Sequence, residues 1–263
     1  MTELQLIGIG TWSSKHGNWA EFCAGMQSGE WPEAVKLQPN LIPPRERRRA
    51  PQLVKMAIEV MDQACKMAAL EPDEIAVIFS SAMGDMQITD YMCAALAQTP
   101  KLISPTKFHN SVHNAAPGYW SITTGAFCPA SAISAFEYTP TMALLEACIQ
   151  AAEEQTPVLC VTQEVAAPPA LMDTCPTKFP FSVAFLLAPA DFCDSPLATV
   201  EFDVSQGSVE WPAIDERLSE FTSNMSARLL PLMTAFAGKR NVDLRFPIAA
   251  EMSLGIRLDL CTT

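Results

Sequence analysis

Short runs of consecutive apolar residues recur along the chain and predict buried β-strands. Runs of this kind, rich in β-branched and aromatic side chains, are typical of strands covered on both faces of a sheet. They occupy residues 4–9, 75–80, 157–165, 181–188 and 198–204. Residues 242–260 alternate in part between apolar and polar positions, which predicts further strands at the carboxyl end.

Other segments repeat apolar residues at helical spacing. Shorter patterns cover residues 18–26 and 86–97. In residues 50–70, one face of a long predicted helix carries Leu53, Ala57, Val60, Met61, Ala64 and Ala68. In residues 218–236, the predicted stripe consists of Leu218, Phe221, Met225, Leu229 and Met233.

A short strand of small residues turns sharply into a helix within residues 129–153. Thr139 is a suitable N-cap and Pro140 suits the first helical position. The helical repeat then runs through Met142, Leu145, Ile149 and Ala152. Many enzymes place a nucleophile at such an elbow, because the helix N-terminus stabilises an anion there. This elbow carries Phe136, Glu137 and Tyr138, and neither a serine nor a cysteine.

Strands and helices alternate through the first part of the chain, and several strands follow. This order predicts an α/β fold with a mostly parallel sheet and helices on its faces. The 263 residues, 49% of them hydrophobic, can bury a large core, so we exclude disorder. We expect one domain spanning residues 1–263.

The net charge of the chain limits the classes of partner that it can bind. The formal net charge is −12, from 29 acidic and 17 basic residues. A charge of this sign is repelled by nucleic-acid backbones and anionic membrane surfaces, so we exclude both as partners. The first residues show no basic segment ahead of an apolar run, and no apolar run reaches membrane-spanning length. We expect neither a signal peptide nor membrane insertion.

Nine cysteines form an odd count without a CxxC pair, and most lie inside apolar segments. This pattern is typical of reduced, buried thiols and favours a cytoplasmic location.

Three local motifs suggest chemistry only weakly. Gly8 and Gly10 begin a pattern typical of nucleotide loops, but Ser13 stands where the third glycine belongs. Residues 45–49, RERRR, form either an anion or carrier-protein patch or a solvated arm, and the acidic rest of the chain favours the arm. His109 and His113 would share a helical face, but no HExxH glutamate or third ligand accompanies them, so we expect no metal.

Five segments, in order, resemble the amino-terminal half of a β-ketoacyl synthase. They are IGIGTWSS, RERRRAPQLVKMAIEVMDQA, IAVIFSSAMGD, SPTKFHNSVHNAAPGYWSITTG and ASAISAFEYTPTMALLEA. Within that superfamily, the chain is most similar to the small ketosynthase-like subunits of aryl polyene pathways, called chain length factors. The resemblance implies a thiolase-like fold, mainly one βαβαβαββ half in residues 1–190. Residues 191–263 would form a strand-helix-strand extension.

The resemblance also implies a subunit without catalysis of its own. In active family members, an elbow cysteine takes the acyl chain from a carrier-protein thioester, and two histidines and a lysine from the second half assist. Alignment of AISAFEYT with that elbow places Glu137 at the cysteine position, and a carboxylate cannot hold a thioester. His16, His109 and His113 all lie early in the chain. We expect no cofactor, since carrier-protein phosphopantetheine would deliver the acyl chain to the partner.

Ketosynthases dimerise through the strand that leads into the elbow. By resemblance, residues 128–136 would pair with a catalytic β-ketoacyl synthase subunit, and residues 106–120 would lie over its acyl tunnel, with Phe108, Tyr119 and Trp120 as candidates for the tunnel floor. The residues expected along the dimer strand are Cys128, Ala130, Ser131, Ala132, Ile133, Ser134 and Ala135. Those expected to face the tunnel or partner are Phe108, His109, His113, Tyr119, Trp120, Phe136, Glu137 and Tyr138.

Two alternatives stay open. One is a stand-alone cysteine-dependent acyl-transfer or decarboxylating enzyme that uses Cys128 or Cys175 with His109 or His113. The other is an acyl-binding module that acts without a ketosynthase.

Overall fold

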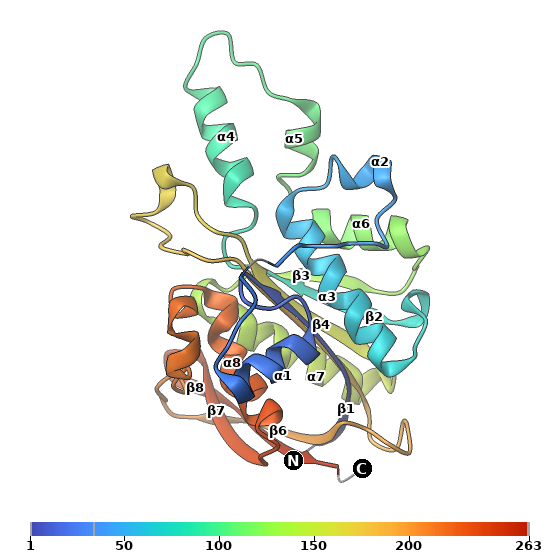
Figure 1. The fold of residues 1–263 in the computed structure, drawn as a ribbon. Helices are drawn as coiled ribbons and strands as arrows, with labels where there is room; N and C mark the ends of the chain where they lie inside the picture. The colour runs from blue at the N-terminus through green and yellow to red at the C-terminus, as the bar shows by residue number, and fades with distance from the viewer. Residues whose placement is uncertain (1, 34, 262–263) are drawn as a thin grey trace.

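One mixed β-sheet runs through the molecule and carries helices on both faces (Figure 1). The computed structural model describes residues 2–33 and 35–261. The strands are β1 (Thr2–Ser13), β2 (Ala76–Ser80), β3 (Ala130–Ile133), β4 (Val158–Glu164), β5 (Phe181–Pro189), β6 (Ala198–Gln206), β7 (Val242–Ala249) and β8 (Met252–Leu260). The α-helices are α1 (Trp19–Ser28), α2 (Pro44–Arg47), α3 (Gln52–Ala68), α4 (Met86–Leu96), α5 (Pro105–His109), α6 (Ala115–Thr124), α7 (Thr139–Glu154) and α8 (Leu230–Ala237). The 3-10 helices are η1 (Pro72–Glu74), η2 (Phe136–Tyr138), η3 (Pro169–Leu171), η4 (Glu216–Phe221) and η5 (Met225–Leu229). None of these described helices is both long enough and apolar enough to cross a membrane.

The strand order across the sheet is β3-β2-β4-β5-β1-β6-β8-β7. Along the chain, β1 to β5 and their helices follow the βαβαβαββ order that the resemblance implies. The expectation of a mostly parallel sheet is wrong, because only β2 pairs in parallel, with β3 and β4. All other neighbours are antiparallel. The connection from β4 to β5 contains no crossover helix, so the chain returns in the opposite direction.

The two faces of the sheet bury two separate hydrophobic cores. Side chains alternate along β4: Val158 and Cys160 pack on the side of α7, while Leu159 and Val161 pack on the side of α3. Helices α1, α7 and α8 cover the first face, and α3 and α6 cover the second (Figure 1). The fold is therefore three layers, helix, sheet and helix.

Gly8 and Gly10 allow the backbone of α3 to lie directly on β1. A Cβ atom at Gly8 would collide with the carbonyl oxygen of Ala64, and one at Gly10 with that of Val60. Close helix-to-strand packing therefore accounts for both glycines of the incomplete nucleotide-loop pattern.

Helix α7 differs in two details from the sequence expectation. Thr139 lies inside the helix, and the residue at the N-cap position is Tyr138. The buried face is also rotated around the helix axis from the expected one, because Ile149 is 42% exposed. The side chains that pack on the sheet side include Ala143, Leu144, Ala147, Cys148 and Ala151.

The single helix expected over residues 218–236 is wrong, since η4, η5 and α8 occupy that segment. The Asn224 side chain accepts a hydrogen bond from the Ser226 N–H and so starts a new turn. Pro231 lies in the first turn of α8, where its missing N–H costs no helical hydrogen bond. The apolar stripe is still largely buried, so the short helices satisfy the same pattern.

Candidate functional site

The elbow between β3 and α7 contains a bulky residue in a left-handed backbone conformation. Phe136 has a φ of 51°, which costs a residue other than glycine about 1–3 kcal/mol. Buried Thr139 holds this conformation, because its hydroxyl donates to the Phe136 carbonyl oxygen at 2.7 Å and accepts from the Ala135 N–H at 2.8 Å. The strained residue of the elbow is therefore Phe136, one position before Glu137.

Residues of the carboxyl-terminal region cover part of the elbow. Tyr138 stacks on Trp211 with ring centroids 6.3 Å apart, and the Arg228 guanidinium lies 4.9 Å from the Trp211 ring centroid. Burial lowers the pKa of Arg228, and the negative charge of Glu137 opposes that shift. Burial also raises the pKa of Tyr138, and Glu137 adds to the shift. Glu137 thus lies near a basic group of its own chain, which sequence spacing could not have shown.

Strand β3 forms one edge of the sheet. It comprises only residues Ala130–Ile133, so Ser134 and Ala135 lie beyond the strand and Cys128 precedes it. Ala130 and Ser131 are exposed, and Ala132 and Ile133 are half-buried. The Cys128 thiol donates a hydrogen bond to the Asp73 carbonyl oxygen at 3.2 Å.

Helices α2, α5 and α6 enclose an open groove of about 570 Å³. Its lining combines apolar and charged side chains, among them Glu46, Arg49, His109, Val112, Tyr119 and Ile122. Phe108 is 60% exposed nearby on α5. Trp120 is only 1% exposed and packs in the core beneath α6, so the expectation that it faces a partner is wrong.

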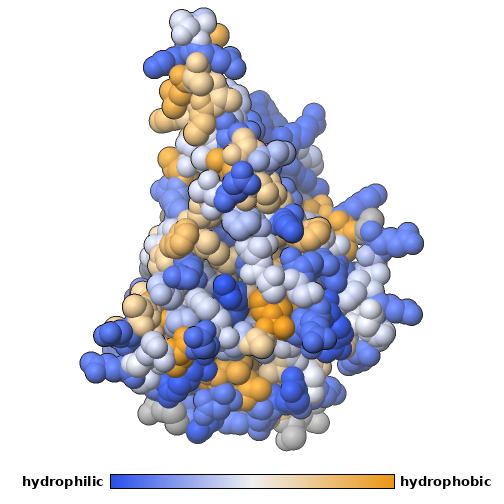
Figure 2. All heavy atoms as spheres, turned by 90° about the vertical axis from the view of Figure 1, so that its left-hand side faces the viewer, coloured by the Kyte–Doolittle hydropathy of each residue, from blue (hydrophilic) through white to orange (hydrophobic). Residues whose placement is uncertain are grey.

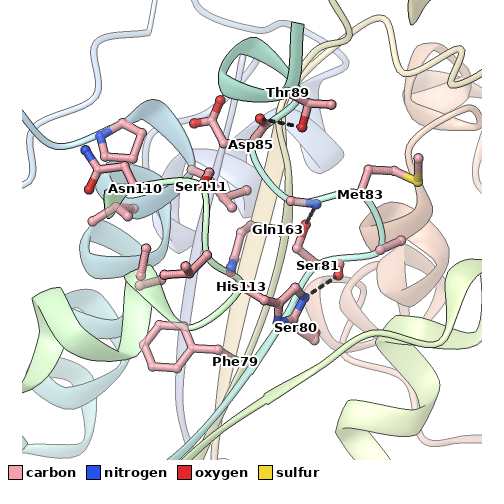
Figure 3. A pocket seen from close by; sticks show the side chains of 18 residues that line it. Phe79, Ser80, Ser81, Met83, Asp85, Thr89, Asn110, Ser111, His113 and Gln163 are labelled. Atoms are coloured by element: carbon pink, nitrogen blue, oxygen red, sulfur yellow. Dashed lines mark hydrogen bonds between the residues drawn. The ribbon is translucent and has the colours of Figure 1, made fainter. Parts of the chain in front are cut away.

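A second, smaller cavity of about 170 Å³ lies where β2 ends, between α3 and the segment before α6 (Figure 3). His113 borders it and its Nε2–H donates to the Ser81 carbonyl oxygen at 3.0 Å. Asn110 and Gln163 are buried polar residues of the same lining. His113 therefore anchors the turn after β2 and lies in a different site from His109.

The two histidines do not share a helix face. His109 is the last residue of α5, and His113 lies in the turn before α6. Among the described residues, no cluster of three histidine, cysteine or acidic side chains could hold a metal ion.

A buried carboxyl group, which the sequence interpretation missed, stabilises the turn after β2. Glu164 accepts hydrogen bonds from the Ala82 N–H and from the Ser81 hydroxyl, the latter at 3.1 Å. Burial raises the pKa of Glu164 to about 7, although these hydrogen bonds oppose the shift. Its position at the carboxyl end of an apolar strand was the only sequence signal. Because its partners belong to the adjacent turn, Glu164 holds that turn in place.

Cys175, one of the two cysteines of the alternative enzyme interpretation, is not an activated thiol. Burial raises the pKa of Cys175, and the charge of Glu164 raises it further. Burial also raises the pKa of Cys65 and of Cys160 to about 12 each. Catalytic cysteines have a lowered pKa instead. In the described residues, His113 bonds to a carbonyl oxygen and Cys128 to another, so this pair is not a catalytic dyad.

Large exposed apolar side chains gather between α4 and the elbow. Seven of the thirteen that the described residues contain lie in residues 96–136. They are Leu96, Leu102, Phe108, Val112, Ile122, Phe127 and Phe136. Helices α4 and α5 project from the body (Figure 1), and Figure 2 shows apolar atoms along the projecting end. Apolar side chains that gather on one exposed surface are typical of protein interfaces.

The sequence also matches a known protein family over most of its length. Residues 19–230 match the family model of the β-ketoacyl synthase N-terminal domain. The chain belongs to the β-ketoacyl synthase family. A comparison of the sequence with curated proteins finds no match.

Solved structures share the fold of this β-ketoacyl synthase family member. One is the ketosynthase ApeO in complex with its chain length factor ApeC from Xenorhabdus doucetiae, with 19% identity, a TM-score of 0.70, and coverage of 98% of this chain and 99% of that chain. A second is the ishigamide ketosynthase/chain length factor, with 15% identity, a TM-score of 0.72 and full coverage of both chains. A third is a β-ketoacyl synthase from Burkholderia phymatum STM815, with 10% identity, a TM-score of 0.74 and full coverage of both chains. These likenesses confirm the thiolase-like α/β fold.

Proposed function

We propose that this chain is the non-catalytic chain length factor of a heterodimer whose other subunit is a catalytic β-ketoacyl synthase. The observation that carries this proposal is the elbow, which turns from strand β3 into helix α7 and bears Phe136, Glu137 and Tyr138. None of these side chains can carry an acyl group as a thioester. Two of the structures that share the fold are named as ketosynthases with chain length factors, which supports this assignment.

The catalytic subunit would bind along β3. An edge strand offers unpaired backbone N–H and C=O groups, and the small side chains of Ala130 and Ser131 allow a second backbone to approach. The apolar side chains of residues 96–136 would be buried around that strand. Cys128, Ser134 and Ala135 would flank the paired segment.

The groove between α2, α5 and α6 would contribute to the wall of the partner's acyl tunnel. Phe108, His109 and Tyr119 lie on or beside this groove. A bulky side chain there would stop a growing chain, because displacing a packed wall costs more than one more buried methylene gains. Their sizes would then set product length in a polyene or polyketide type of elongation.

The chemistry would take place on the partner. Carrier-protein phosphopantetheine would deliver the acyl chain to the catalytic subunit, so this chain would need no cofactor and would contact the acyl carrier protein only indirectly. All nine cysteines are free thiols, which supports a reducing, cytoplasmic location.

Co-expression of this chain with its cognate ketosynthase tests the proposal. We expect the two proteins to elute together on size exclusion. After incubation with charged acyl carrier protein, intact mass should show an acyl group on the ketosynthase only. Separate elution would contradict the heterodimer, and an acyl group on this chain would contradict its non-catalytic role and favour a cysteine enzyme.

A further inference from the structure

The side chain of Phe136 is mostly exposed although its backbone is strained. Its backbone is left-handed, with a φ of 51°, yet its side chain is 61% exposed. Glycine or asparagine would adopt this backbone more easily, and burial of the ring does not compensate for the strain. A bulky residue held in this way points to a contact outside the chain.

The two edges of the sheet differ in how they are protected. Strand β7, at the far edge, carries Asp243, Arg245 and Pro247, and charges and prolines of this kind prevent edge-to-edge pairing. Residues 125–135, which include β3, contain no charged side chain and no proline within the strand itself. The β3 edge is short and follows Pro129, but it carries none of the charged side chains that keep the β7 edge from pairing.

Two phenylalanines flank this uncharged edge. Phe127 precedes β3 and is 99% exposed, and Phe136 follows it. A second strand that paired with β3 would meet one aromatic ring at each end. Buried aromatic side chains are the commonest anchors of protein interfaces.

We propose that Phe136 and Phe127 are the two anchors by which β3 binds the catalytic ketosynthase, each ring entering an apolar pocket of that subunit. This inference rests on the proposed function. A second copy of this chain fits less well, because it would bring together two proteins that each carry a net charge of −12. The occupant that we infer is therefore the catalytic subunit of the proposed heterodimer.

Binding of the co-purified cognate ketosynthase to variants of the full chain tests the anchors. Phe136→Gly removes the ring and relieves the backbone, so the melting temperature of the isolated chain should stay the same or rise. Its dissociation constant for the ketosynthase should increase by about tenfold or more. Phe127→Ala should weaken binding in the same direction. Phe192→Ala, which removes a 41% exposed ring between β5 and β6, should leave binding within about twofold.

Opposite effects on stability and affinity distinguish an anchor from a structural residue. Phe136→Asn provides a second variant, since asparagine tolerates the left-handed backbone. If the wild-type chain binds the ketosynthase and both Phe136 variants bind equally well, the proposed anchor role is refuted. The proposed heterodimer is then supported. If the wild-type chain binds no ketosynthase, or forms a homodimer that Phe136→Gly dissociates, the proposed heterodimer and the proposed anchor role are both contradicted.

Discussion

The Thr139 hydroxyl donates a hydrogen bond to the Phe136 carbonyl oxygen at 2.7 Å, and this contact closes the elbow. The same hydroxyl accepts from the Ala135 N–H. One buried side chain thus satisfies two backbone groups on either side of the strained peptide. The elbow keeps its shape although it bears neither a serine nor a cysteine, which leaves β3 and its flanks exposed to the proposed partner.

Replacing Thr139 by valine should destabilise the chain, because the half-buried Ala135 N–H would lose its acceptor. We expect Thr139→Val to lower the free energy of unfolding by about 1–3 kcal/mol, measured by urea denaturation. Thr222→Val is the matched control, since the Thr222 hydroxyl also bonds to a carbonyl oxygen but is exposed. Its effect should stay within about 0.5 kcal/mol. Equal losses in both variants would contradict the role of the Thr139 hydroxyl.

Adding a methyl group at Gly10 should be severely destabilising. The new Cβ would collide with the carbonyl oxygen of Val60, and α3 would have to move away from β1. We expect Gly10→Ala to cost about 3 kcal/mol or more in the free energy of unfolding. Gly118 lies inside α6 with open space around its Cβ position, so Gly118→Ala should stabilise by up to about 1 kcal/mol. Thermal unfolding of both variants measures this difference, and a well-folded Gly10→Ala would refute the close packing.

The buried Glu164 carboxyl should make stability fall as the pH rises. Its folded-state pKa is about 7 against an ordinary value of 4.5, so the folded state binds more protons between these values. Stability from this group is therefore present below pH 4.5 and is lost as the pH rises toward 7, by at most about 1.4 kcal/mol per pH unit. Glu164→Gln cannot ionise, so its stability relative to wild type should increase over that range in urea titrations at several pH values. A pH-independent difference would contradict the raised pKa.

His16 should produce the opposite pH dependence. It is fully buried between Thr11 and Ser13, whose hydroxyls lie 2.9 Å from its two ring nitrogens. Burial, with a smaller effect of Lys15, lowers the pKa of His16 from 6.5 to about 3. The unfolded state therefore binds more protons between these values, and stability falls as the pH decreases from 6.5 toward 3.

Acid titrations of His16→Gln measure this contribution. The variant should be less stable at neutral pH, because both hydroxyls lose a partner, and its stability should depend less on pH below 6.5 than that of wild type. His109→Gln, which removes a surface histidine, is measured beside it for comparison. If His16→Gln keeps the wild-type slope, another group causes the acid sensitivity.

Glu137 should be dispensable for catalysis by the proposed heterodimer. It lies at an exposed position near Arg228 of its own chain, and the acyl group would be carried by the partner. We expect Glu137→Ala to change turnover by less than about tenfold, a small loss compared with that of a nucleophile. Steady-state assays should accompany size exclusion, so that assembly is known to be intact. A much larger loss in an intact heterodimer would assign Glu137 a chemical role.

Local patterns predicted most elements of the first 190 residues, because a buried strand or long helix leaves its periodicity in its own residues. The elbow was recognisable for the same reason, from small residues followed by Thr139 and Pro140. The prediction of one helix over residues 218–236 was wrong, because its stripe of apolar residues suits three short helices equally well. Only the capping contact of Asn224 and the position of Pro231 distinguish these cases.

Side-chain direction at the candidate site could not be deduced from the sequence. Trp120 and Tyr119 are neighbours, yet one is buried in the core and the other lines the groove. His109 and His113 have helical spacing, yet the chain turns between them. The antiparallel part of the sheet was not predicted either. The direction of a strand depends on whether the connection before it crosses over the sheet or reverses the chain.

The sequence by itself determined the family, the order of the first five strands along the chain and the absence of a thiol at the elbow. Each of these follows from the identities of neighbouring residues in the chain. Only the tertiary structure decided that Phe136 is the strained residue, that Arg228 lies near Glu137 and that β3 lies at an edge of the sheet. These relationships join segments distant along the chain or depend on one backbone angle. They arise when the sheet and its two helical layers pack together.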